Sequence, residues 1–94
     1  MVVRIATFLK RPEVDPQEHD KFRRWIGEQP GCVAGYHVAG ADGRVLSLSF
    51  WESRDALMAL KSRVYPGAPL SMKPDEVAVY DVEAVFGPHS PPLG

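Results

Sequence analysis

Residues 30–57 decide the fold, and they read PGCVAGYHVAGADGRVLSLSFWESRDAL. Two runs within this stretch, over 32–41 and 44–51, are predicted strands. Asp42 and Gly43 separate the runs, and this dipeptide between two such runs is a strong hairpin signal. The stretch therefore predicts two antiparallel neighbouring strands.

A helix is predicted on each side of this hairpin. After it, Ser53 can cap a helix N-terminus. Apolar residues then recur at helical spacing, at Ala56, Leu57, Leu60 and Val64. Before the hairpin, a helix is predicted over 16–29. Asp15 precedes it and can cap its free N–H groups, and Glu18 can close a capping box. Pro16 suits the first helical position because no N–H donor is needed there.

The outer parts of the chain complete the pattern. Residues 2–9 and 76–86 are predicted strands, and the proline-rich stretch 65–75 is a predicted loop. The order β-α-β-β-α-β is typical of an α+β, ferredoxin-like fold, in which two helices cover one face of a four-stranded antiparallel sheet. We expect a single domain over 1–86 and a proline-rich tail over 87–94.

The predicted strands are apolar on both faces. In the first strand, for example, the alternating sets are Val3, Ile5 and Leu9 against Val2, Ala6 and Phe8. Two helices can cover only one face of the sheet, and a solvated face normally alternates to polar residues. The uncovered face therefore predicts a partner, most economically a second copy of the chain in a homodimer.

Composition narrows the classes of function. The chain has 94 residues and a net charge of −1, with charges of both signs interspersed, which does not favour nucleic-acid binding. The longest segment without a charged residue, 29–41, is too short to cross a membrane. Cys32 is the only cysteine, so an internal disulfide is excluded and a reducing cytoplasm is favoured. No histidine has a second ligand at metal-binding spacing, so we expect no metal site.

Three pieces of the sequence carry a resemblance to a known family. They are Pro30-Gly31, Asp42-Gly43 and the segment 50–57, Phe-Trp-Glu-Ser-Arg-Asp-Ala-Leu. In this order they resemble the antibiotic biosynthesis monooxygenase (ABM) family of the dimeric α+β barrel superfamily. The resemblance implies a pocket between helices and sheet, and oxygenation of a small electron-rich phenol or quinol without a bound cofactor. The same scaffold also serves other chemistries.

Residues of two branches of the family can be compared with this chain. The polyketide oxygenases carry an asparagine four residues before the tryptophan, and one tyrosine each on the second strand and the second helix. Here these positions hold Ser47, His37 and Leu57, and Trp51 alone matches. The haem-degrading branch would require an asparagine, a tryptophan and a histidine. The corresponding residues are Thr7, Leu60 and about Leu70, so we expect neither haem degradation nor a haem cofactor.

His37 is the candidate general base, because an imidazole takes up a proton near neutral pH. Its place depends on the hairpin register. A two-residue turn at Asp42 and Gly43 would pair Ser47 with Val38 and send His37 to the opposite face. A type I turn followed by Gly43 as a left-handed bulge would pair His37 with Ser47. We adopt the second register, which the resemblance favours.

In that register, a half-buried surface with a histidine and two serines predicts a pocket. The expected catalytic residues are His37 as the base, Ser47 as a hydrogen-bond donor to a substrate oxygen, and Trp51 as a wall for the ring. Packing is the alternative role of Trp51, and the alternative for His37 is a strand histidine whose ring is satisfied by the backbone or by water. The expected substrate-binding residues are Phe22, Trp25, Ile26, Ser49 and Leu57.

Arg4 is unusual because it places a charge in the middle of a predicted strand. Its side chain could reach past the sheet edge, pair with Asp81 or Glu83 on the last strand, or face an anionic ligand. We expect the ion pair.

Two other functions stay open at this point. The loss of the asparagine and both tyrosines favours a non-catalytic dimer that binds a small ligand or is purely structural. An isomerase or decarboxylase would also need only a base in a pocket. With any of the three functions we expect neither nucleic acid nor a membrane as a partner.

Overall fold

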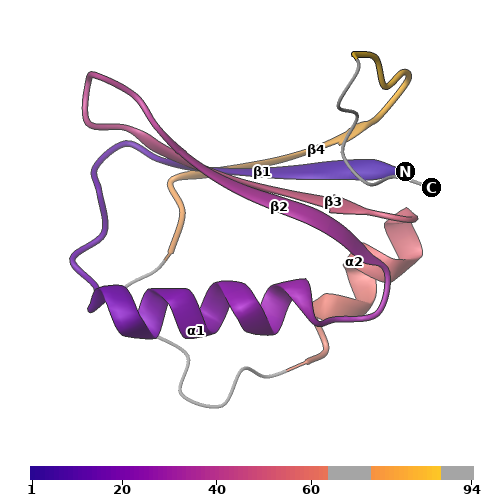
Figure 1. Ribbon diagram of the computed structural model, residues 1–94, viewed down its shortest axis with the longest axis horizontal. Coiled ribbons are helices and arrows are strands. Elements are labelled where there is room, and N and C mark those ends of the chain that lie inside the picture. Colours follow the sequence, from indigo (N-terminus) through magenta and orange to yellow (C-terminus); the bar gives the residue numbers. More distant parts are fainter. Residues whose placement is uncertain (64–72, 88–94) are drawn as a thin grey trace.

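The computed structural model describes residues 1–63 and 73–87 (Figure 1). The elements are β1 (Val2–Phe8), α1 (Pro16–Gly27), β2 (Cys32–Ala39), β3 (Val45–Trp51), α2 (Arg54–Leu60) and β4 (Glu76–Asp81). This is the predicted order. Val64, most of the predicted loop over 65–75 and the tail beyond residue 87 lie outside the described residues.

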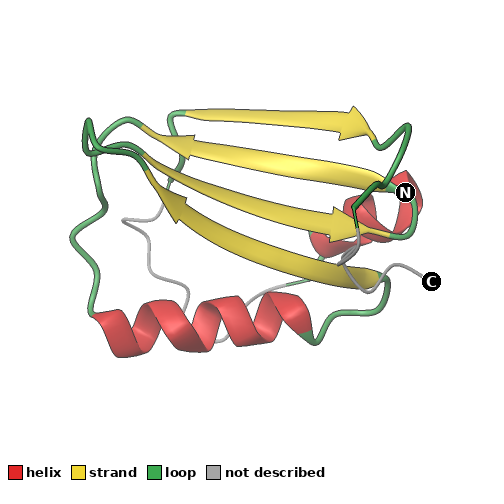
Figure 2. Cartoon of the chain, turned by 45° about the horizontal axis from the view of Figure 1, so that its top comes forward, coloured by secondary structure: helices red, strands yellow, loops and turns green. Residues whose placement is uncertain are grey.

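The four strands form one antiparallel sheet in the order β2-β3-β1-β4. Both helices lie on the same side of this sheet, as Figure 2 shows. The predicted ferredoxin-like α+β fold is therefore confirmed. β1 is a central strand, and its residue Val2 pairs with Trp51 on β3 and with Asp81 on β4. Among the described residues, no helix is long and apolar enough to cross a membrane.

The hairpin between β2 and β3 has the register with the bulge. The Gly40 N–H donates to the Arg44 carbonyl at 2.8 Å, and Gly43 has a φ of +88°, which favours glycine. His37 consequently pairs with Ser47, as predicted. Both residues therefore belong to one face of the sheet, and this is the face that the helices cover.

The helix starts follow the sequence closely. The Asp15 carboxylate accepts a hydrogen bond from the Gln17 N–H at 2.8 Å, and the Ser53 hydroxyl accepts one from the Ala56 N–H at 3.1 Å. The predicted capping box is wrong, because the Glu18 carboxylate turns to Lys21, 3.3 Å away. α1 also ends earlier than predicted, at Gly27.

β4 ends at Asp81, whereas the sequence predicted a strand up to residue 86. The reason is its partner, since β1 begins at Val2, which already pairs with Asp81. One more hydrogen bond follows, from the Val82 N–H to the Met1 carbonyl at 3.0 Å. Beyond it the described sheet offers no further partner, and Phe86 is exposed.

Between the helices and the sheet, the core is divided. One cluster consists of Val2, Trp51 and Leu57, and the other of Ala6, Phe8 and Val45. No residue of α1 is buried, although this helix runs along the sheet. The space between the two clusters is therefore not filled by close packing.

The opposite face of the sheet, which we call the open face, is apolar. Its large side chains are Val3, Ile5, Tyr36, Val38, Leu46, Leu48, Phe50 and Tyr80. Tyr36 packs edge-on against Phe50, and Tyr80 remains 57% exposed. No helix of the described chain covers this face (Figure 2).

Candidate functional site

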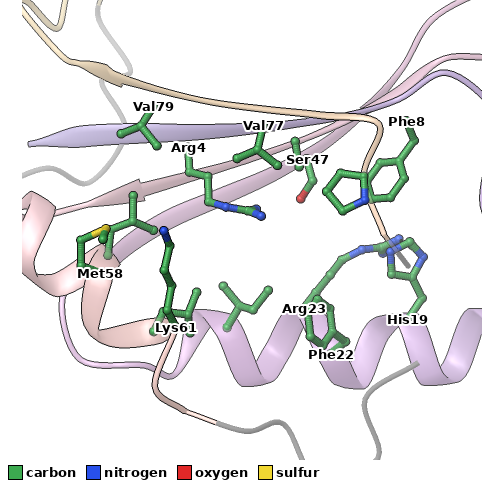
Figure 3. A pocket seen from close by; sticks show the side chains of 15 residues that line it. Arg4, Phe8, His19, Phe22, Arg23, Ser47, Met58, Lys61, Val77 and Val79 are labelled. Atoms are coloured by element: carbon green, nitrogen blue, oxygen red, sulfur yellow. Dashed lines mark hydrogen bonds between the residues drawn. The ribbon is translucent and has the colours of Figure 1, made fainter. Parts of the chain in front are cut away.

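Two adjoining cavities occupy the space between the helices and the sheet. The larger has a volume of about 280 Å³ and the smaller about 220 Å³. They share Arg4, Arg23, Ile26, Ser47 and Leu60. Figure 3 shows the larger one, with Arg4 and Ser47 pointing from the sheet toward Phe22 and Arg23 of α1. Together the cavities approach the size of known small-molecule sites.

The structure brings together six of the eight residues that the sequence predicted for this site. They are Phe22, Ile26, His37, Ser47, Ser49 and Leu57. Trp25 and Trp51 are not among the described residues that line the cavities. Trp25 instead stacks on Phe22, with ring centres 6.2 Å apart.

Trp51 belongs to the core, so the interpretation of its ring as a wall for substrate is wrong. Its side chain is completely buried in a cluster with Val2 and Leu57. Alternation along the strand correctly predicted that Trp51 faces the helices. Trp51 is, however, the last residue of β3, and there α2 packs against it. The indole N–H donates to the Ser49 hydroxyl oxygen at 2.9 Å. Through this hydrogen bond Trp51 positions a residue that does line the smaller cavity.

His37 lies in the smaller cavity with both ring nitrogens unused. The residue as a whole is half-buried, but Nδ1 and Nε2 are shielded from solvent and have no hydrogen-bond partner among the described residues. Burial lowers the pKa of His37, and the positive charges of Arg23 and Arg11 lower it further. Both effects favour the neutral imidazole, which is the form that can accept a proton. No group in the described chain satisfies it, which argues against a histidine held by hydrogen bonds to the backbone.

His19 on α1 adds a second imidazole beside the first. The rings of His19 and His37 meet edge-on, with centres 5.5 Å apart. Arg23 lies within 3.0 Å of His19 Nδ1 and 2.9 Å from the Asp20 carboxylate. Since a guanidinium only donates, His19 Nδ1 accepts and its proton resides on Nε2. Burial lowers the pKa of His19, followed by the charge of Arg23.

Arg4 is the residue that the sequence interpretation misplaced. The expected partner Asp81 pairs with Arg54 at the start of α2, 3.3 Å away. Glu83 follows the end of β4 and is exposed. Arg4 lies instead where the two cavities meet, and burial lowers its pKa. The signal in the sequence was the mid-strand charge itself, which the structure places at the cavities and not in an ion pair along the sheet.

Several other residues that line the larger cavity were not predicted. They are Ala6, Phe8, His19, Arg23, Met58, Leu60, Lys61, Pro74, Val77 and Val79. Thr7, which the comparison with haem-degrading proteins had singled out, pairs with Leu46 on the open face. Ala6 is its neighbour that faces the cavity. Leu70 lies outside the described residues. In the described part of the chain, no three His, Cys, Asp or Glu side chains gather into a metal-binding cluster.

Known proteins resemble this chain in structure, but no match is found from its sequence. No family model matches the sequence, and no curated protein matches it significantly. A haem-degrading protein from Mycobacterium tuberculosis aligns with 18% identity over 92% of this chain and 98% of its own, with a TM-score of 0.61. A mutant of the protein MhuD with two manganese protoporphyrin IX molecules per active site aligns with 16% identity, over 93% and 99% of the two chains, and a TM-score of 0.62.

A monooxygenase extends this set of structures. The product of the gene ActVA-Orf6 of Streptomyces coelicolor, in complex with nanaomycin D, has 23% identity and a TM-score of 0.55. The alignment covers 94% of this chain and 92% of that one. The structural similarity establishes the fold, but sequence identities this low leave the chemistry open. The chain therefore has the fold of the antibiotic biosynthesis monooxygenase family that its sequence resembles.

Proposed function

We propose that this protein is a cofactor-free monooxygenase for a small electron-rich aromatic substrate, a phenol or a quinol. The observation that carries the proposal is the pair of unpartnered, shielded nitrogens of His37 in a cavity between helices and sheet. A buried polar group without a partner costs free energy and is retained where a ligand uses it. The monooxygenase of the same fold supports this class of reaction.

In this mechanism the protein removes one proton and excludes water. His37 accepts the proton of the substrate, which leaves an electron-rich anion. Ser47, its cross-strand neighbour, donates a hydrogen bond to the substrate oxygen. Phe22, Ile26 and Leu57 form apolar walls that keep water from the anion.

The electrons for the reduction of O₂ come from the substrate anion itself. For an anthrone, one oxygen atom of O₂ becomes the new carbonyl oxygen of an anthraquinone. The other oxygen leaves as water, together with the two hydrogens of the oxidised carbon. The reaction therefore balances without an added reductant.

Aerobic turnover of a panel of anthrones and quinols tests this function. We expect O₂ consumption that follows quinone formation one to one in the purified protein, with no added metal, flavin or haem. Haemin is a control substrate, for which we expect no reductant-dependent bleaching of the Soret band. Clean conversion of haemin would assign the chain to the chemistry of its haem-degrading neighbours instead. Tight binding of the aromatic compounds without O₂ consumption would favour a ligand-binding protein.

The assembly that we propose is a homodimer joined through the open face. The apolar side chains of that face are of the kind that proteins bury against a partner, and the face belongs equally to both copies in a two-fold arrangement. Sedimentation at micromolar concentration should give twice the chain mass of 10.4 kDa.

A charge at the centre of the open face should separate the two copies. Ile5 lies there between Leu48 and Ala78, so we expect Ile5→Lys to sediment as a folded monomer. Lys21→Glu on the outer surface of α1 is the matched control and should remain dimeric. A monomeric wild-type protein, or a dimer that Ile5→Lys leaves intact, would contradict this interface.

A further inference from the structure

The cavities are lined by positive charges. Arg4, Arg23 and Lys61 contribute their side chains, as Figure 3 shows. No aspartate or glutamate is found among the described residues that line either cavity. A mainly apolar space with charges of one sign is suited to a ligand of the opposite sign.

The three cations are not equivalent. Arg23 already pairs with Asp20, and 40% of its side chain is exposed. Lys61 follows the end of α2 and is exposed. Arg4 extends from the central strand β1 into the space between the layers, and it has no ion pair or hydrogen bond to any residue that the structure describes. A partly desolvated cation without a counter-charge is costly, so Arg4 is the cation with most to gain from an anionic ligand.

Ser49 provides a second group at the same place. It lies directly across from Arg4 in the pairing of β1 with β3, and it lines the smaller cavity. Its oxygen accepts the hydrogen bond from the Trp51 indole, so its own hydroxyl proton is left to donate. A guanidinium fork and a hydroxyl donor side by side can together bind the two oxygens of a carboxylate.

The sheet register sets the distance from this pair to the proposed base. Arg4 on β1 pairs with Ser49 on β3, and His37 on β2 pairs with Ser47 on β3. β1 and β2 flank β3 on opposite sides, and Ser47 and Ser49 are two residues apart along it. Two strand spacings combined with two residues of rise separate the backbones of Arg4 and His37 by about 12 Å. One flat ligand of two or three fused rings can span the space between their side chains.

We propose that the substrate is an aromatic hydroxy acid whose carboxylate binds Arg4 and Ser49, while its hydroxyl group faces His37 at the other end of the ring system. This inference rests on the proposed function for the role of His37. The carboxylate site itself stands on the geometry of Arg4 and Ser49, and it can be measured without turnover.

Calorimetric titration with two matched probes tests the carboxylate site. 2-Naphthoate and its neutral isostere 2-naphthamide have the same rings, and neither carries a hydroxyl group to oxidise. We expect wild-type protein to bind the naphthoate at least about 10-fold more tightly than the amide. Arg4→Met should weaken naphthoate binding by about 10–100-fold and leave binding of the amide almost unchanged. Ser49→Ala should have a smaller effect in the same direction.

Arg54→Met is the matched control, since Arg54 pairs with Asp81 and lines neither cavity. It should bind both probes as the wild type does. If Arg4→Met and Arg54→Met lose naphthoate affinity equally, the preference for naphthoate comes from general attraction between charges, and the proposal is overturned. Equal losses for the two probes in Arg4→Met, or wild-type protein that does not prefer the naphthoate, would also overturn it.

The stability of the variant is part of the same test. Because Arg4→Met removes an unpaired, partly buried charge, the ligand-free variant should melt at or above the wild-type temperature. Should it fail to fold, Arg4→Lys takes its place. It keeps the charge and loses the fork, so naphthoate affinity should fall between that of the wild type and that of the amide. Selective naphthoate binding without any oxygenation would uphold the carboxylate site and count against the proposed function alone.

Discussion

Replacing His37 with alanine is expected to lower kcat/KM for an oxidisable phenol by about 10²–10⁴-fold, the usual effect of losing a general base. The dimer and the fold should be retained, because His37 lies on the helix-covered face and makes no hydrogen bond within the described chain. His37→Gln should be as slow, since an amide cannot take up the proton. Added imidazole should restore part of the activity to the alanine variant. Unchanged turnover in both variants would refute the role of His37 as base.

The pH profile provides an independent measure of the same role. Burial and the charges of Arg23 and Arg11 lower the pKa of His37 below its ordinary value of 6.5. A base works in its deprotonated form, so kcat/KM should rise with pH through a pKa below 6.5. This rising limb should be absent from His37→Gln. A limb that persists there would assign the titration to another group, such as His19.

Replacing Trp51 with alanine is expected to destabilise the protein by about 3–5 kcal/mol, the usual cost of emptying a buried tryptophan site. Trp51 is the largest fully buried side chain of the described core, and it joins Val2 of β1 to Leu57 of α2. The loss also removes the donor to Ser49. Urea unfolding at one fixed protein concentration measures the change.

Trp25→Ala is the matched control for this variant. Trp25 is half-buried and stacks on Phe22, so its loss should cost much less than that of Trp51. Trp51→Phe keeps most of the packing and should fall between the two. If Trp51→Ala unfolds at the wild-type urea concentration and loses turnover alone, Trp51 acts in the chemistry and our assignment of it to the core is wrong.

The fold could be predicted because its signals are local. Ser53 and Asp15 cap their helices through contacts with residues two or three positions away. Gly43 allows the bulge that pairs His37 with Ser47, so the register of the hairpin was also within reach of the sequence. The end of β4 was not, because it depends on where its distant partner β1 begins.

The site could be predicted only in part. Alternation along a strand indicates which face of the sheet a side chain lies on, but not whether it is buried in the core or lines a cavity. His37, Ser47 and Trp51 share one face, but Trp51 lies beneath α2 and the other two lie beside the cavities. The isolation of Arg4 has a similar cause. The sequence suggested Asp81 as a partner for Arg4 because both lie on neighbouring strands. In the structure α2 places Arg54 next to Asp81, and these two residues form the ion pair.

The central place of β1 has a consequence for how the chain folds during synthesis. Val2 is synthesised before both of its neighbours in the sheet, Trp51 and Asp81, which lie far along the chain from it. The hairpin of β2 and β3 can form from local contacts, whereas β1 stays unpaired until β3 has been made. Its second edge is satisfied only when β4 appears. Such distant pairing slows folding and leaves an apolar strand exposed to aggregation until both of its neighbours have been made.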